Sequence, residues 1–177
     1  MRRRHPLPKI WLMTDPRIDD LAAAINRLPK RSGIVFRHYG MARTERRLLF
    51  RQAKRLAKRG RHTLILADRP EVAKHWCADG VHSRSAHRST GLRTVAVHSA
   101  REAALARRIG ADLIFASPVF ATRSHVGAKA LGRARLGLMI GIQRHRTISL
   151  GGMDARRAKS LSALKLYGWA AIDAFRI

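Results

Sequence analysis

Polar side chains follow nearly every short apolar run of this sequence, and they are the groups that could do chemistry. In chain order they are Thr14, Asp15, residues 37–39, Asp68, Arg69, His82, Ser83, His98, Ser99, residues 117–125, Gly151, Gly152 and Asp173. If they meet in one place, these groups suit a phosphorylated or diphosphorylated small molecule, with a divalent metal on the carboxylates. A histidine after a strand is more often structural than catalytic, so the histidines alone do not decide the function.

The segment SLGGMDARRA carries the most specific of these signals. Gly151 and Gly152 can expose backbone N–H groups in a tight turn, and Asp154 is placed to cap a helix that follows. Backbone donors after the seventh and eighth strands hold a phosphate in many (βα)8 barrels. The pair is therefore a candidate phosphate turn, and an ordinary tight turn is the alternative.

Eight apolar runs are the predicted strands that must position these residues. They lie at 9–15, 33–39, 62–68, 79–83, 93–99, 112–120, 146–153 and 168–175, and predicted helices lie at 19–28, 43–59, 71–77, 100–109 and 154–166. Strands that alternate with helices indicate a parallel sheet, and the strands are apolar on both faces as such a sheet requires. The first turn, TDPRIDD, contains no glycine, which disfavours a doubly wound sheet with a dinucleotide site.

The predicted fold class is α/β, a compact (βα)8 TIM barrel that lacks its last helix. Eight strands in 177 residues leave only about 22 residues for each unit. The segment 84–92 is too short for a full helix, and the chain stops directly after the eighth strand. A homodimer or the amino-terminal arm would cover the groove that a missing helix leaves.

The length predicts a single domain over 1–177, with residues 1–9 as a basic amino-terminal arm. Cys77 is the only cysteine and has no Cys or His neighbours at zinc-ligand spacing, which predicts a reducing, cytoplasmic location. The apolar run IWLM is too short for a signal peptide or a membrane span, so we expect no membrane partner.

The net charge of +26 is extreme for this length and concerns partners rather than fold. In the densest block the cations lie at helical spacing opposite apolar residues; they are Arg43, Arg47, Arg51, Lys54, Arg55 and Lys58. Such a stripe is usually a solvated helix face, and a groove for nucleic acid or an acidic partner is the alternative. An aromatic content of 6% and the lack of a recognisable binding motif disfavour nucleic acid.

Taken in chain order, the strand-end segments resemble the thiamine phosphate synthase/TenI family of compact (βα)8 barrels. The similarity covers nearly the whole chain, in the segments WLMTD, FR, LILAD, ADGVH, VAVHSAREA, GADLIFASPVFATRSH and ISLGGM. The resemblance implies a step of thiamin biosynthesis in which hydroxymethylpyrimidine diphosphate and thiazole phosphate are joined and pyrophosphate is released. It also implies Mg²⁺ as the cofactor and catalysis that is largely electrostatic.

The resemblance also implies roles for individual residues. By position, Arg37 would contact the diphosphate, Asp68 would bind Mg²⁺, and Thr122 would contact thiazole phosphate. The predicted catalytic residues are Arg37, Asp68 and His125, with Asp68 as the metal ligand; the predicted substrate- and phosphate-binding residues are Ser117, Thr122, Gly151, Gly152 and Asp173.

The chain departs from the family pattern within the site itself. At seven positions this chain has a different residue from the one that the family usually has. The family's Gln and Lys on either side of the second-strand Arg are Val35 and Tyr39 here, and its Asn before the third-strand Asp is Ala67. Its second metal-binding Asp is His87, its fifth-strand Ser is Ala96, its Lys after the sixth strand is His125, and its eighth-strand Ser is Asp173. These changes remove ligands for diphosphate and metal, which Arg69, Arg84, Arg123 and Arg176 could replace.

Three interpretations therefore stay open. The first is a synthase with a rebuilt diphosphate site, and the second is a TenI-type thiazole phosphate isomerase with His125 as its acid and base. The third is a catalytically degenerate barrel that binds nucleic acid or an acidic partner through its basic surface.

Overall fold

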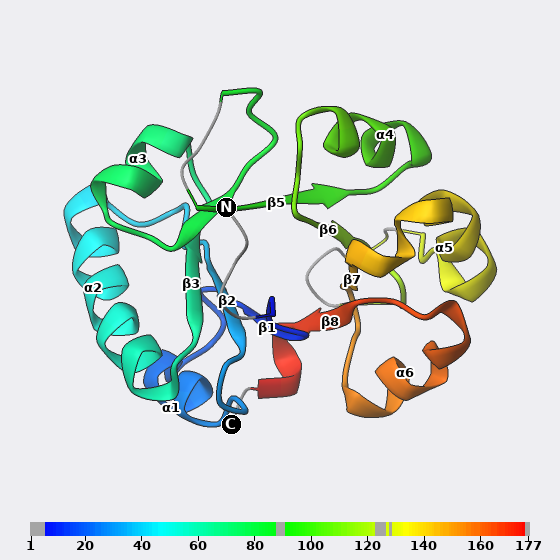
Figure 1. Cartoon of the computed structure of the whole chain (residues 1–177). Coiled ribbons are helices and arrows are strands. Elements are labelled where there is room, and N and C mark those ends of the chain that lie inside the picture. Colours follow the sequence, from blue (N-terminus) through cyan, green and yellow to red (C-terminus); the bar gives the residue numbers. More distant parts are fainter. Residues whose placement is uncertain (1–5, 88–90, 123–126, 128, 176–177) are drawn as a thin grey trace.

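Eight parallel strands close on one another in the computed structural model, which describes residues 6–87, 91–122, 127 and 129–175 (Figure 1). They are β1 (Ile10–Met13), β2 (Gly33–Phe36), β3 (Thr63–Leu66), β4 (Gly80–His82), β5 (Leu92–Val97), β6 (Leu113–Ala116), β7 (Thr147–Ser149) and β8 (Gly168–Ala171). Each strand pairs with the next one along the chain, and β8 pairs with β1 to close the barrel. The predicted α/β class and (βα)8 TIM barrel are confirmed.

Helices form a ring around the strands (Figure 1). They are α1 (Leu21–Asn26), α2 (Arg43–Gly60), α3 (Pro70–His75), α4 (Ala100–Arg108), α5 (Gly132–Ile140) and α6 (Ala155–Ser160), with 3₁₀ turns at Gly141–Arg146, Ser162–Leu164 and Asp173–Phe175. The sequence patterns did not predict α5, because its apolar residues are not confined to one face: Leu136 is buried whereas Leu138 is 83% exposed. The predicted helix at 154–166 is instead the short α6 followed by a 3₁₀ turn.

Full helices are lacking after two strands in the part of the chain that the structure describes. Residues 83–87 after β4 have no helix, and only the 3₁₀ turn Asp173–Phe175 follows β8. Residues 1–5 of the predicted amino-terminal arm lie outside the described residues. The end of that arm is held at the barrel, because the Tyr167 hydroxyl donates to the carbonyl of Leu7 at 2.7 Å and the Trp169 N–H donates to that of Lys9 at 2.8 Å.

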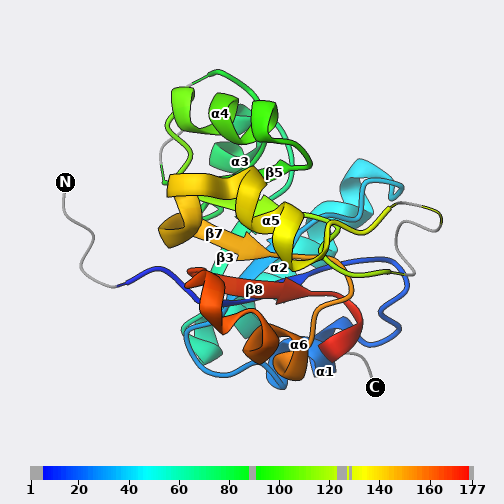
Figure 2. The same cartoon turned by 90° about the vertical axis from the view of Figure 1, so that its right-hand side faces the viewer.

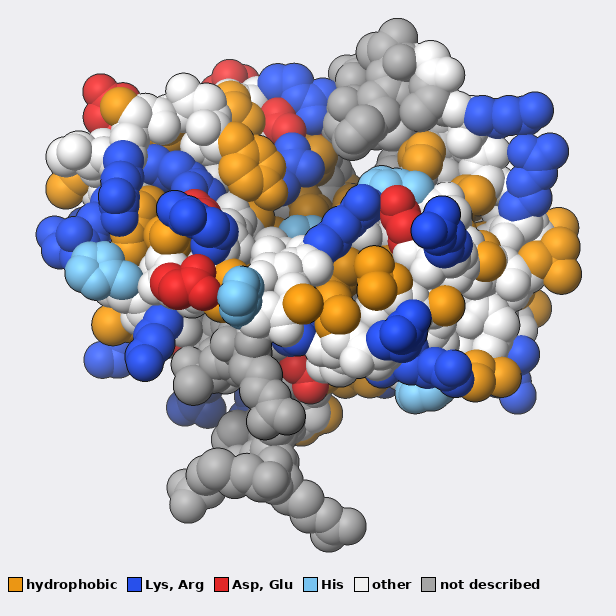
Figure 3. All heavy atoms as spheres, turned by 90° about the horizontal axis from the view of Figure 1, so that it is seen from above, with side chains coloured by type: hydrophobic (Ala, Val, Ile, Leu, Met, Phe, Trp, Pro, Cys, Tyr) orange, Lys and Arg blue, Asp and Glu red, His pale blue; other side chains and the backbone are white. Residues whose placement is uncertain are grey.

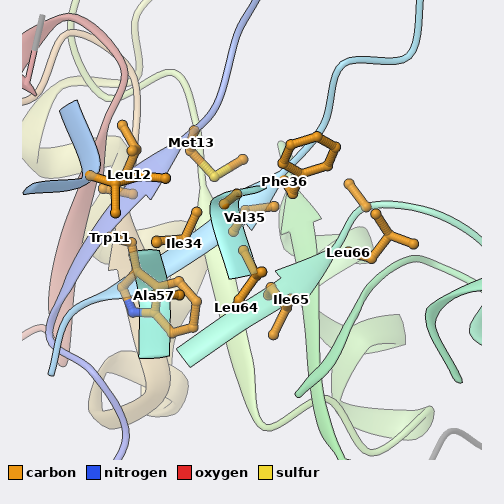
Figure 4. Close-up of a cluster of buried hydrophobic side chains, with 14 of the residues drawn as sticks. Trp11, Leu12, Met13, Ile34, Val35, Phe36, Ala57, Leu64, Ile65 and Leu66 are labelled. Atoms are coloured by element: carbon orange, nitrogen blue, oxygen red, sulfur yellow. The ribbon is translucent and has the colours of Figure 1, made fainter. Parts of the chain in front are cut away.

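The core lies both inside the barrel and between the barrel and its helices. Figure 4 shows part of it, with β1 to β3 contributing Trp11, Leu12, Met13, Ile34, Val35, Phe36, Leu64, Ile65 and Leu66, and α2 contributing Ala57. The indole of Trp11 packs edge-on against Phe115 at 5.4 Å between ring centroids. A Cβ at Gly33 would lie 2.2 Å from that indole, so the start of β2 requires a glycine. Burial on both faces explains why the strands are apolar without alternation.

All strands of a parallel barrel end at the same side, and this side carries the loops that matter for function. In Figure 2 the chain enters at the left and β8 points to the right, where the long loops gather. No helix among the described residues is long and apolar enough to cross a membrane.

Candidate active site

One cavity of about 560 Å³ lies at the carboxyl ends of the strands. It is lined by residues that follow β2, β6, β7 and β8. Five of the eight predicted site residues meet there, namely Arg37, Thr122, Gly151, Gly152 and Asp173. A cavity of this size suits a small-molecule ligand.

The Gly-Gly turn after β7 has the geometry that the sequence suggested. Gly151 and Gly152 have φ angles of +93° and +61°, which side chains disfavour. A Cβ at Gly151 would lie 2.7 Å from Cα of Pro118, and one at Gly152 would lie 2.4 Å from the carbonyl oxygen of Ala121. The turn can therefore pack this closely against residues 118–121 only because both residues are glycines.

Helix α6 begins beside this turn and adds a cation that the sequence analysis missed. The carboxylate of Asp154 accepts the Arg157 N–H at 2.7 Å and so caps the helix. The Arg157 side chain lines the same cavity, lies over the Phe120 ring at 5.4 Å and donates to the carbonyl of Gly152. Its place three residues after a capping Asp was the available signal.

Arg37 is held at the cavity by the end of β1. Its guanidinium donates to a carboxylate oxygen of Asp15 at 2.5 Å and to the carbonyl of Thr14 at 3.0 Å. The other oxygen of Asp15 accepts from the Arg17 side chain at 2.6 Å. Burial would raise the pKa of Asp15, but the hydrogen bonds and charge of Arg17, with that of Arg37, hold it below its usual value. Two cations thus share the carboxylate of Asp15, and the charge of Asp173 acts on Arg17 as well.

Asp68, the predicted metal ligand, lines a second cavity of about 420 Å³ with residues that follow β2 to β5. One of its oxygens lies 2.5 Å from Nη1 of Arg46, and the other accepts the Arg69 N–H at 2.7 Å. Arg46 comes from α2 and is 8% exposed, and its guanidinium also donates to the carbonyls of Arg37 at 2.8 Å and Ala67 at 2.9 Å.

Arg46 lies within the block of cations for which the sequence predicts a solvated stripe, so the charge pattern alone did not reveal its role. Arg46 in fact belongs to the buried face of α2, with Phe50, Ala53 and Ala57. A cation at helical spacing with buried apolar residues was the signal that could have revealed it.

The described residues do not fit a magnesium site. Mg²⁺ needs near-octahedral oxygen ligands, usually from one or two carboxylates with water and phosphate. Among the residues that line the second cavity, Asp68 is the one carboxylate. Both oxygens of Asp68 already accept hydrogen bonds. We therefore derive no step through a metal.

The remaining predicted residues have separate surroundings. Ser117 directly follows β6 and is not part of the lining of these two cavities; its carbonyl lies 2.7 Å from Nδ1 of His98. His82 lines the second cavity and lies 2.7 Å from the Thr94 hydroxyl. Burial lowers the pKa of His82 to about 4, so its imidazole is neutral near pH 7. His125 lies outside the described residues.

The carboxyl ends of the strands, with the two cavities that they carry, form the mouth of the barrel, and arginines line both cavities. Together with the closed eight-stranded topology, this mouth defines the class of protein: a compact (βα)8 barrel with small-molecule cavities at the carboxyl ends of its strands. The family described as thiamine monophosphate synthase matches residues 11–175, and the chain belongs to this family. The resemblance on which the sequence analysis relied is confirmed.

Solved structures agree on the fold. A thiamine phosphate pyrophosphorylase from Pyrococcus furiosus is 21% identical with a TM-score of 0.76, over 94% of this chain and 86% of that one. One from Bacteroides thetaiotaomicron is 15% identical with a TM-score of 0.65, over 94% and 83%. A structure described as native KDPGal is 13% identical with a TM-score of 0.64, over 96% and 84%. No curated protein matches the chain.

Proposed function

We propose that this chain joins hydroxymethylpyrimidine diphosphate to thiazole phosphate and releases pyrophosphate. Family membership supports a role in thiamin biosynthesis. The observation that carries the proposal is the single cavity in which the Gly151–Gly152 turn, Thr122 and Arg37 come together.

In this proposal the chain acts by binding and by electrostatics. The Gly151–Gly152 turn and Thr122 hold thiazole phosphate, with Arg157 as a further cation beside the phosphate. Arg37 stabilises the negative charge that grows on the departing diphosphate, and Asp15 fixes the direction of its guanidinium. The ring nitrogen of thiazole phosphate then captures the pyrimidine cation, so no nucleophilic side chain is needed.

The proposed partners are accordingly phosphorylated small molecules. Cys77 is exposed and free, which supports a reducing, cytoplasmic setting as predicted. The homodimer stays a prediction.

Calorimetric titration with thiazole phosphate tests the phosphate turn. We expect saturable binding to the full chain and binding at least about tenfold weaker in Gly152→Ala, because the added Cβ displaces the backbone donors. Gly110→Ala is the matched control, since Gly110 has a similar φ of +69° and no atom within 4 Å of a Cβ. Absence of saturable binding to the wild-type chain, or equal loss in both variants, would refute the assignment.

A further inference from the structure

We infer that the second cavity binds the diphosphate group as a metal-free anion, with the Arg46–Asp68 ion pair in place of a metal ion. The inference rests on the proposed function for the identity of the ligand. The observations behind it are the hydrogen bonds and ion pairs that carboxylates of the mouth already make with arginines.

Arg46 already supplies a buried positive charge to the carboxylate of Asp68. Its Nη1 is 2.5 Å from Asp68, its Nη2 donates to the carbonyl of Ala67, and its Nε donates to that of Arg37. The guanidinium also lies 5.6 Å from the ring centroid of Tyr39 and 5.5 Å from that of Trp76. A metal on Asp68 would have to displace this side chain, and a guanidinium that is taken from its partners inside a protein is costly.

Two other carboxylates near the mouth, Asp15 and Asp154, also have partners already. Asp15 is 7% exposed and accepts hydrogen bonds from the side chains of Arg17 and Arg37. Asp154 caps α6. Each of these groups would lose a cation or an N–H partner if it turned toward a metal, whereas Mg²⁺ needs oxygen ligands that are available together.

The second cavity instead offers guanidinium groups to an anion. Arg69 and Arg84 both line it, and the carboxylate that lines it with them, Asp68, is paired with Arg46. The side chain of Arg84 is 51% exposed and contacts Glu102 at 3.1 Å, an exposed pair of the kind that contributes little. His82 adds no charge near neutral pH. Arginine binds phosphate oxygens with two parallel donors, so Arg69 together with Arg84, once Arg84 exchanges its exposed Glu102 partner for the anion, can hold a diphosphate without a metal.

Inorganic pyrophosphate is the probe for the first test, with the full chain titrated calorimetrically in EDTA and again in Mg²⁺. We expect saturable binding in EDTA that Mg²⁺ strengthens by no more than about threefold. In parallel, the electron paramagnetic resonance signal of free Mn²⁺ should be unchanged when the protein is added. Pyrophosphate binding only in Mg²⁺ would overturn the inference, as would Mn²⁺ binding that Asp68→Asn abolishes.

Two double variants distinguish a specific pyrophosphate site from nonspecific electrostatic attraction of pyrophosphate to a basic protein. Arg69→Gln with Arg84→Gln should weaken pyrophosphate binding in EDTA by about tenfold or more, because both arginines line the cavity. Lys58→Gln with Arg59→Gln removes the same charge at the far end of α2, and binding should stay within about twofold of wild type. Equal weakening in both would overturn the inference.

The proposed function can fail separately. A chain that forms thiamine phosphate only with Mg²⁺ contradicts the metal-free site and leaves the proposed reaction standing. A chain that binds pyrophosphate in EDTA but forms no thiamine phosphate contradicts the proposed reaction and leaves the metal-free site standing.

Discussion

Asp15 and Asp68 share one arrangement: each accepts hydrogen bonds from an arginine that the fold holds in place. Asp15 lies between Arg37 and Arg17, and Asp68 pairs with Arg46. These pairs orient their guanidinium groups and leave the mouth with an excess of positive charge. Such a mouth favours ligands that bring several negative charges, as phosphorylated substrates do.

His82 makes the stability of this fold depend on pH. Its pKa of about 4 in the folded chain compares with about 6.5 in an unfolded one, so the unfolded state takes up a proton first as the pH falls. Stability from this residue is therefore complete above about pH 6.5 and is lost as the pH falls toward 4, by about 1–2 kcal/mol at pH 5. Urea unfolding at pH 7.5 and pH 5 should show a smaller loss for His82→Gln than for wild type. An equal loss in the two proteins would contradict this assignment.

Helix α2 contributes side chains both to the mouth of the barrel and to a separate surface groove. Its buried face delivers Arg46 to the mouth, and its exposed cations line a groove of about 730 Å³ with Arg61, His62 and Asp79. The helix ends at Gly60 and is capped by Arg61, whose φ of +55° is left-handed. Glycine is the usual residue at this position of a helix end, because other side chains are strained there.

Replacing Arg61 by glycine should therefore stabilise the protein. We expect Arg61→Gly to raise the free energy of unfolding by about 0.5–1 kcal/mol, measured by urea unfolding monitored by circular dichroism. Arg59→Gly is the matched control, since it removes the same side chain from the last turn of α2 and should lower stability by up to about 1 kcal/mol. Destabilisation by Arg61→Gly would show that its side chain contributes more than its backbone strain costs.

At the scale of the whole molecule, the barrel could be predicted from the sequence because local patterns determine it. Apolar runs on a regular spacing placed all eight strands, and glycines and caps placed most helices. Helix α5 was missed because its burial depends on tertiary contacts rather than on one apolar face. The Gly151–Gly152 turn was found from local chemistry, whereas the Arg46–Asp68 pair joins residues 22 positions apart and became visible only in the fold.

The surface charge is also a property of the whole molecule. Figure 3 shows Lys and Arg side chains spread across the face in view, among few Asp and Glu side chains. On this face the charge is spread as on a solvated surface, whereas the exposed cations of α2 line a groove. Binding of nucleic acid or an acidic partner through the basic surface stays a prediction.

Formation of thiamine phosphate is the most direct test of the proposed function. The purified chain would be incubated with hydroxymethylpyrimidine diphosphate and thiazole phosphate, and products would be separated by chromatography. The proposal predicts that thiamine phosphate and pyrophosphate appear in equal amounts over time. It also predicts that the Arg37→Gln variant forms both products at least about tenfold more slowly than wild type. A wild-type chain that binds thiazole phosphate yet forms neither product would contradict it.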